Sequence, residues 1–158
     1  MSSPDQPVRR PGRSPAGQAP EVVNVDQPFD LDGLYALRST LAAHASALGA
    51  DPDQIEHLVI VAGELASNAI RHGGGTGQLR LWHRDGVVYC QVSDNGPGIR
   101  DPDVGTKPPD PANHDGGRGL WICRHLSTEL TIEAGPEGQG ATVTAAIPRH
   151  DHEPPPHQ

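Results

Sequence analysis

Basic residues and aromatic residues are both scarce in this sequence. Its 158 residues include 12 Lys and Arg against 20 Asp and Glu, for a formal net charge of −8, and aromatics make up only 3%. An acidic chain has no general electrostatic attraction for nucleic acid, and no basic stripe interleaved with aromatics is present. Direct binding of DNA or RNA is therefore not expected.

Long apolar runs are absent, and cysteine is rare. No apolar stretch approaches the roughly 20 residues that a membrane-spanning helix needs, and the N-terminus lacks the apolar core of a signal peptide. We therefore expect no membrane contact and a cytoplasmic location. The two cysteines, Cys90 and Cys123, show no CxxC or metal-ligand spacing, so we expect reduced, partly buried thiols.

Proline and glycine are abundant, with 17 and 19 residues. Residues 1–20 contain almost nothing apolar to bury, and the tail at 149–158 has the same character, so both are expected to be disordered. The remaining residues, 21–148, are enough for a single core. We therefore expect one folded domain over 21–148.

The apolar periodicity along residues 21–148 predicts an α+β domain. Period-two segments indicate strands, three-and-four spacings indicate helices, and Asp85-Gly86 between two alternating segments is a strong hairpin signal. The expected order is a strand at 21–25, helices at 32–48 and 52–72, strands at 78–84 and 87–94, a long irregular stretch at 95–117, a helix at 120–126, and strands at 128–134 and 141–148. We expect a two-layer sandwich, in which a mixed, mostly antiparallel or fully antiparallel β-sheet is covered on one face by helices.

Glu64 and Asn68 form the first candidate functional pair. Residues four apart on a helix lie about 40° apart, so the two side chains project together, opposite an apolar stripe centred near Ala62. From periodicity alone, a solvated polar face is the simpler explanation. The functional interpretation is a carboxylate that polarises a nucleophile, beside an amide oxygen that ligates Mg²⁺.

Asp94 ends a predicted strand and is followed at once by Asn95-Gly96-Pro97-Gly98. Two glycines two residues apart permit positive φ angles and let the backbone approach a flat ligand closely. An Asp at a strand end is suited to accept a hydrogen bond from an exocyclic amine in a pocket. For this loop alone, an ordinary Asn-Gly or Pro-Gly turn is the alternative.

A third candidate segment, Gly117-Arg118-Gly119, precedes the predicted helix at 120–126. Backbone N–H groups at a helix start, with the helix macrodipole behind them, bind anions such as phosphate. A flexible glycine-rich linker would have the same sequence character. No GxxxxGK[ST] phosphate loop occurs in the chain.

The order and context of these segments are more specific than any one of them. Glu64-x-x-x-Asn68-Ala69, Asp94-x-Gly96-x-Gly98 and Gly117-x-Gly119-Leu120 resemble the N, G1 and G2 boxes of the ATPase superfamily that includes gyrase, heat-shock chaperones, histidine kinases and MutL. The later Gly140-Ala141-Thr142-Val143 resembles that superfamily's threonine strand. Within it, the segment at 63–73 (GELASNAIRHG) resembles the anti-sigma-factor serine/threonine kinases.

This resemblance implies a histidine-kinase-like ATPase fold that binds ATP and Mg²⁺. It implies that Asp94 bonds the adenine amino group, that Asn68 helps to hold Mg²⁺, and that Glu64 is the general base for a protein hydroxyl. The pocket would be shaped by the glycine-rich segments, namely Gly96, Gly98, Gly117, Arg118, Gly119 and Leu120. Residues 95–117 would be its lid, and Thr142 would support the adenine indirectly.

The resemblance also implies partners. An anti-sigma serine/threonine kinase binds a sigma factor and switches partners by phosphorylating a small antagonist domain of the STAS kind. The first helix resembles the region through which the family forms homodimers.

The positions before the third segment depart from the kinase pattern. Kinase members often have a basic residue there, whereas this chain has Asn113, His114 and Asp115; the nearby cations are Lys107 and Arg118. Two alternatives therefore stay open: an ATP-sensing interaction module without kinase activity, and a detached histidine-kinase catalytic domain. The glutamate at position 64, where histidine kinases carry asparagine, argues against the second.

Overall fold

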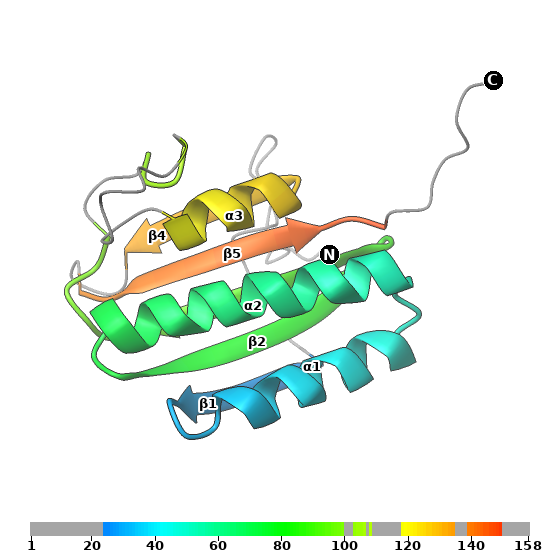
Figure 1. The fold of residues 1–158 in the computed structure, drawn as a ribbon, viewed down its shortest axis with the longest axis horizontal. Helices are drawn as coiled ribbons and strands as arrows, with labels where there is room; N and C mark the ends of the chain where they lie inside the picture. Colours follow the sequence, from blue (N-terminus) through cyan, green and yellow to red (C-terminus); the bar gives the residue numbers. More distant parts are fainter. Residues whose placement is uncertain (1–23, 100–102, 107, 109–117, 135–138, 150–158) are drawn as a thin grey trace, which may run out of the picture.

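Helices cover one face of a single β-sheet in the structure, which is a computed structural model (Figure 1). It describes residues 24–99, 103–106, 108, 118–134 and 139–149. The elements, in chain order, are β1 (Val25–Asp30), α1 (Leu34–Ala47), α2 (Pro52–His72), β2 (Thr76–Arg84), β3 (Val87–Asp94), α3 (Arg118–Leu126), β4 (Glu129–Ala134) and β5 (Ala141–Ile147).

The sheet has five strands in the order β1-β2-β3-β5-β4, and each pair of neighbours among the described strands is antiparallel. The three described helices lie on the same side of it (Figure 1). The predicted α+β two-layer fold is therefore confirmed. Of the two sheet types left open by the sequence, the described strands form the fully antiparallel one.

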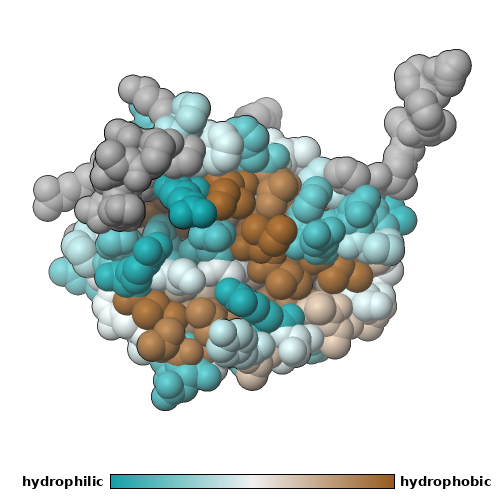
Figure 2. All heavy atoms as spheres, in the orientation of Figure 1, coloured by the Kyte–Doolittle hydropathy of each residue, from teal (hydrophilic) through white to brown (hydrophobic). Residues whose placement is uncertain are grey.

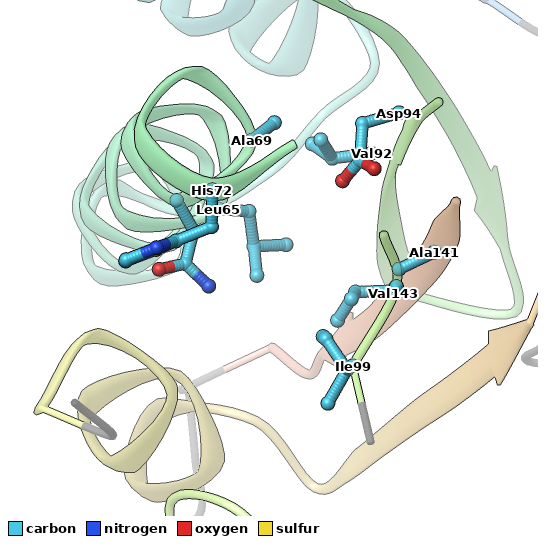
Figure 3. A pocket seen from close by; sticks show the side chains of 10 residues that line it. Leu65, Ala69, His72, Val92, Asp94, Ile99, Ala141 and Val143 are labelled. Atoms are coloured by element: carbon cyan, nitrogen blue, oxygen red, sulfur yellow. The ribbon is translucent and has the colours of Figure 1, made fainter. Parts of the chain in front are cut away.

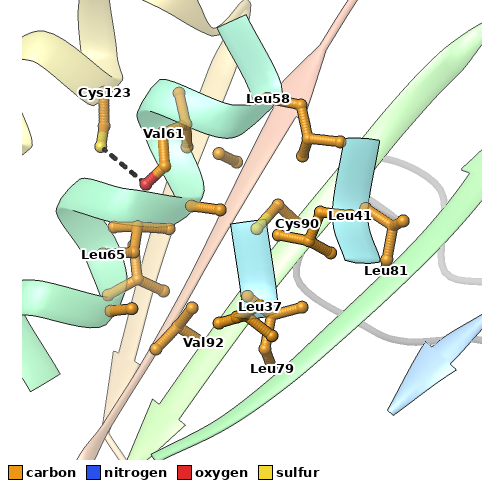
Figure 4. Close-up of a cluster of buried hydrophobic side chains, with 14 of the residues drawn as sticks. Leu37, Leu41, Leu58, Val61, Leu65, Leu79, Leu81, Cys90, Val92 and Cys123 are labelled. Carbon is orange, nitrogen blue, oxygen red and sulfur yellow. Dashed lines mark hydrogen bonds between the residues drawn. The ribbon is translucent and has the colours of Figure 1, made fainter. Parts of the chain in front are cut away.

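The core lies between the helices and every second residue of the strands. In β3, Val88, Cys90 and Val92 are buried and face the helices, as the period of two predicts. Figure 4 shows side chains of α1 and α2 meeting those of β2 and β3, among them Leu37, Leu41, Leu58, Val61, Leu65, Leu79 and Leu81. Full burial of each such side chain contributes about 1.5–3 kcal/mol.

The start of α2 is fixed by a capping box. The Asp51 side chain accepts a hydrogen bond from the Gln54 N–H at 2.7 Å, the Asp51 N–H donates to Gln54 Oε1, and Pro52 occupies the first turn. The amide nitrogen of Gln54 also donates to the carbonyls of Gly86 and Ile147, at 3.0 and 2.9 Å. One side chain therefore both caps α2 and ties it to the β2–β3 turn and to β5.

The prediction for the first strand was wrong. We expected it at 21–25, but β1 spans Val25–Asp30, and residues 21–23 lie outside the described residues. Pro28 lies inside β1 and argues against a strand when only sequence is considered. It is tolerated because β1 is at the edge of the sheet, where one side of the strand needs no ladder hydrogen bonds.

The remaining elements agree with the sequence to within two residues. The expected bounds of α2 and β3 are those found, while α1 begins at Leu34 and α3 at Arg118. The segment expected to be disordered at 1–20 lies outside the described residues, as does the expected tail at 149–158 except for Arg149, which the structure describes. Within the part that the structure describes, no helix is long and apolar enough to cross a bilayer.

Candidate functional site

The second half of α2, the end of β3 and the start of β5 enclose a small pocket (Figure 3). Its lining residues are Leu65, Asn68, Ala69, His72, Val92, Asp94, Gly98, Ile99, Ala141 and Val143. The two predicted segments around Asn68 and Asp94 thus meet at one site. The free space in the pocket is small, about 30 Å³.

Asp94 is the last residue of β3. It lies two residues after Val92, which faces the helices, so strand alternation puts Asp94 and its pairing partner Ala141 on the helix side as well. Figure 3 shows its carboxylate directed into the space between α2 and the strands. Its Oδ1 accepts a hydrogen bond from the Gly96 N–H at 2.9 Å. The pocket therefore has one anionic acceptor against apolar walls, an arrangement that suits a flat ring with an exocyclic N–H group.

Three glycines hold the backbone around Asp94. A Cβ on Gly73 would lie 2.5 Å from Asp94 Oδ2, and one on Gly96 would lie 2.7 Å from the carbonyl carbon of Gly73. Gly140, at a φ of +78°, donates its N–H to the Gly96 carbonyl at 2.7 Å. Gly73 and Gly140 were not among the predicted site residues, since only the fold reveals that their missing side chains make room for this turn.

Asn68 lines the pocket, whereas Glu64 lies one turn earlier on α2 and meets α3. A Cβ on Gly119 would stand 2.8 Å from Glu64 Oε1. Both polar side chains are half-buried, so the simple solvated face considered from periodicity does not describe them. The glycine at 119 instead brings the α3 backbone against the Glu64 carboxylate.

The third predicted segment is described in part. Gly117 lies outside the described residues, as do Lys107 and the 113–115 positions. Arg118 is exposed in the first turn of α3, while Leu120 is only 4% exposed and belongs to the hydrophobic core. Neither lines the small pocket. Gly119 therefore has the closest contact with the site among the described residues of this segment.

The Thr142 side chain lies on the opposite face of β5 from the pocket. Its neighbours Ala141 and Val143 line the pocket, and Thr142 itself pairs with Ser93, to whose Oγ its hydroxyl donates at 3.3 Å. Strand alternation places the methyl of Ala141, rather than the threonine hydroxyl, at the pocket wall. An indirect role for Thr142, through Ser93, stays a prediction.

One turn of the expected lid is held against α3. The Thr106 N–H donates to the Asp103 carbonyl at 3.1 Å, and Gly105 packs so tightly on α3 that a Cβ would lie 2.7 Å from Leu120. Arg124 Nε donates to the Val104 carbonyl at 3.0 Å. Sequence reasoning missed this anchor, because an isolated arginine on a helix carries no signal of its carbonyl partner.

The apolar walls and His72 were also missed as site residues. Leu65, Ala69, Val92 and Val143 follow ordinary core periodicity, so nothing in the sequence separates them from the rest of the core. His72 ends α2 directly before the glycine run and lines the pocket. The signal that could have identified His72 is its spacing, because it lies four residues, or about one helical turn, after the predicted Asn68 on α2.

The two cysteines are free thiols, as expected, and both are fully or nearly fully buried. Burial raises the pKa of Cys90 to about 12. Burial also raises the pKa of Cys123, with smaller contributions from Cys90 and Glu64. The Cys123 thiol donates to the Val61 carbonyl at 3.8 Å (Figure 4). The thiols are therefore structural groups and have no place in the site chemistry.

The described residues contain no cluster of three or more His, Cys, Asp or Glu side chains that would hold a metal ion by themselves. A magnesium ion that arrives with a nucleotide needs less, because phosphates and water supply most of its ligands. The Asn68 amide oxygen, a hard ligand at the pocket, fits that requirement.

Comparison with known proteins places this geometry in a family. The model of the histidine kinase-like ATPase domain matches residues 27–147. An anti-sigma F factor of Geobacillus stearothermophilus is 30% identical over 114 residues, which cover 67% of this chain and 77% of that protein. The signal transduction histidine-protein kinase AfsQ2 of Streptomyces coelicolor is 32% identical over 117 residues, covering 66% of this chain and 21% of that protein.

Solved structures have the same fold. A Mycobacterium tuberculosis protein with RsbU and RsbW domains superposes with a TM-score of 0.53 at 21% identity, covering 78% of this chain and 32% of that one. The family match begins at residue 27, within β1, and ends at the last residue of β5, so it covers all or most of every described strand and helix. The chain therefore belongs to the histidine kinase-like ATPase domain family.

Proposed function

We propose that this protein is an ATP-dependent serine/threonine protein kinase of the anti-sigma-factor type, which regulates transcription by partner switching. The observation that carries the proposal is the line of polar groups from Asp94 through Asn68 to Glu64, which runs from the pocket to the start of α3. The relatives named anti-sigma F factor support the regulatory role.

The pocket supports adenine binding. Asp94 is an acceptor for the exocyclic amine, and the apolar side chains of Leu65, Val92 and Val143 can sandwich a flat ring. A space of about 30 Å³ is much smaller than a purine, so the pocket has to widen before a nucleotide enters. The loop residues Gly98 and Ile99, which line it without belonging to a helix or strand, are the natural part to move.

The phosphates would extend from this pocket toward Asn68 and the start of α3. Asn68 would hold Mg²⁺, whose charge neutralises the phosphates when it is bound. The serine or threonine oxygen of the partner protein would attack the γ-phosphorus. The bond between the γ-phosphorus and the bridging oxygen would break, and ADP would leave with that oxygen. Glu64, a half-buried carboxylate beside Gly119, takes the hydroxyl proton.

The partners follow from the same family. A sigma factor would be held in one nucleotide state and released when a STAS-domain antagonist binds, which places the protein in the cytoplasm. A homodimer through the first helix is part of this proposal. Leu31 and Tyr35, 65% and 80% exposed beside and within the first turn of α1, support such an interface.

The kinase proposal is tested by following labelled γ-phosphate from ATP to STAS proteins recovered from a lysate. Glu64→Gln should reduce transfer about 10²–10⁴-fold, because the general base is lost, while ATP still binds. Glu56→Gln, an exposed carboxylate on the same helix, is the matched control and should transfer at the normal rate. ATP binding without transfer to any antagonist, or normal transfer by the Glu64 variant, would reject the kinase.

One observation favours a second candidate, an ATP-sensing interaction module. Among the described residues, no Lys or Arg lines the pocket, and Arg118 is exposed. Under this alternative Glu64→Gln leaves partner control intact, whereas Asp94→Asn abolishes it. An acid-labile phosphate on a partner histidine would instead identify a histidine-kinase catalytic domain.

A further inference from the structure

Residues 103–106, which we call the docked turn, pack directly on α3. The Thr106 N–H and hydroxyl both donate to the Asp103 carbonyl, at 3.1 and 2.7 Å, and close the turn. Gly105 is buried at a φ of +85°, and a Cβ there would lie 2.7 Å from the backbone carbon of Leu120. The turn and the helix therefore meet backbone to backbone, an approach that requires glycine.

Arg124 holds the docked turn from the side of α3. Its Nε donates to the Val104 carbonyl at 3.0 Å, and Val104 packs against the hydrophobic core. The helix itself is well anchored, since Cys123 is fully buried and its thiol donates to the Val61 carbonyl of α2. The docked turn is thus fastened to an element that belongs to the core.

A short link joins the docked turn to the pocket. Residues 100–102 alone separate Ile99 from Asp103 in the chain. An extended chain advances at most about 3.6 Å per residue, so the two Cα atoms lie within about 14 Å of each other. Ile99 lines the pocket, across from Leu65 and Ala69 of α2 (Figure 3). The anchor on α3 therefore limits how far Ile99 can move away from α2.

The loop that carries Ile99 is held at both ends. Before it, the Gly96 N–H donates to Asp94 Oδ1 at 2.9 Å, and the Gly96 carbonyl accepts from the Gly140 N–H at 2.7 Å. After it comes the docked turn. The described residues leave about 30 Å³ in the pocket, less than a purine fills, so one end has to yield for a nucleotide. The first end includes Asp94, whose place the adenine needs, which leaves the end on α3.

We propose that Arg124 is a positioning residue of the nucleotide pocket. By holding the docked turn on α3 it keeps Ile99 close to α2, and release of the turn lets the pocket widen. The inference rests on the proposed function for the identity of the ligand, a nucleotide. The apparent affinity of a mostly closed protein is reduced by the fraction of the open form, so loss of the anchor should strengthen nucleotide binding.

Two variants release the docked turn from opposite sides. Arg124→Ala removes the donor to the Val104 carbonyl. Gly105→Ala leaves Arg124 in place but sets a methyl group against Leu120, at a φ that disfavours alanine. His125→Ala is the matched control, because this exposed residue lies on the same helix and its ring contacts the carbonyl of Trp121 rather than the turn.

An introduced thiol reports the position of the loop without any nucleotide. Ile99→Cys is placed in each form, where the buried Cys90 and Cys123 thiols should be unreactive. The rate at which a thiol reagent modifies the introduced cysteine should rise several-fold with Arg124→Ala and with Gly105→Ala, and stay unchanged with His125→Ala. Only one thiol per chain should react, which separates loop movement from unfolding. An unchanged rate in either releasing variant, or the reaction of all three thiols, overturns the proposal.

Nucleotide binding is measured separately, in the chain that keeps isoleucine at position 99. A fluorescent ATP analogue with Mg²⁺ should associate several-fold faster with Arg124→Ala and Gly105→Ala than with the parent protein or His125→Ala. Equal or slower association in the releasing variants overturns the proposal. If the parent protein binds no ATP analogue, the proposed function fails, and the reactivity at position 99 alone decides whether Arg124 positions the loop.

Discussion

Asp94 keeps its position because the residues packed around it have no side chains. Its carboxylate lies where a Cβ of Gly73 would be, and its loop is closed by the hydrogen bond from Gly140 to Gly96. The end of β3 can therefore approach α2 closely enough for Asp94 and Asn68 to share a pocket. The proposed nucleotide pocket, with Asp94 at its base, depends on these glycines as much as on the carboxylate itself.

Gly73→Ala should weaken both folding and ATP binding. Gly73 has an ordinary φ of −112°, so the cost arises from the contact with Asp94 Oδ2 at 2.5 Å and not from backbone strain. Such overpacking should lower the free energy of unfolding by about 1–3 kcal/mol, measured by urea denaturation. Gly33→Ala is the control, since its Cβ would meet its nearest neighbour at 3.6 Å. A Gly73 variant with unchanged stability and affinity would contradict this packing.

The buried thiols should make stability depend on alkaline pH. The folded pKa of Cys90 is raised to about 12, and that of Cys123 is raised as well, whereas an unfolded thiol ionises near ~8.5. Their contribution is thus complete below pH ~8.5 and is lost as pH rises above it, because only the unfolded chain releases the protons. The free energy of unfolding should fall by up to about 1.4 kcal/mol per pH unit for each thiol.

Urea denaturation between pH 7.5 and 9.5 measures this slope. A Cys90→Ala, Cys123→Ala double variant should show a clearly flatter pH dependence than the parent protein, although its absolute stability is lower. Equal slopes in the two proteins would show that the thiols ionise alike in the folded and unfolded chain.

The helix α2 connects the layers and presents the site. Its first turn is capped by Asp51 and held to β5 by Gln54, its middle packs on the sheet, and its last turns carry Glu64 and Asn68. A shift of this helix along its axis would move both polar groups relative to Asp94. The bonds at its start therefore position groups more than two turns away.

Gln54→Ala should destabilise the fold without touching the site. The Gly86 and Ile147 carbonyls would lose their donor, and the capping box would lose one of its two bonds. The expected loss is about 2–4 kcal/mol in the free energy of unfolding. Glu56→Ala, an exposed position in the next turn, should cost far less. Equal losses in the two variants would show that Gln54 is not a structural link.

Local chemistry decided which elements the sequence could predict. The bounds of α2 followed from a cap, a proline and a long periodic stripe, and the β2–β3 hairpin from Asp85-Gly86. β1 was misplaced because its proline is acceptable only at a sheet edge, and the edge position is a property of the assembled sheet.

The same limit applies to the site. Glu64, Asn68 and Asp94 can be identified as site residues from their spacing in the sequence. The packing of Gly73 against Asp94, and the fact that Ala141 and not Thr142 lines the pocket, depend on how the strands and helices are arranged in the fold. Contacts between residues far apart in the chain leave no periodic trace. The sequence therefore predicts the polar groups of the pocket better than the surfaces that hold them.

In the whole molecule, the pocket lies on the side of the sheet that the helices cover (Figure 1). The pocket lies between the helices and the strands, and its lining residues come from α2, β3, β5 and the loop after β3. The described residues leave a space of about 30 Å³ in the pocket, which is less than a purine fills. Under the proposed function, a nucleotide would move the loop at 98–99 away from α2, and a ligand that binds only such an opened form shifts the population toward it.

Discrimination of the adenine amino group by Asp94 is the most direct test of nucleotide binding at this pocket. Titration calorimetry with Mg²⁺ compares ATP with purine riboside triphosphate, which lacks that amino group. The parent protein should bind ATP about 10–100-fold more tightly, since a hydrogen bond to a charged group is worth about 1.5–3 kcal/mol. Asp94→Asn should bind ATP weakly and lose the discrimination. Equal affinities of the parent protein for the two nucleotides, or unchanged discrimination in the variant, would contradict an adenine site at Asp94.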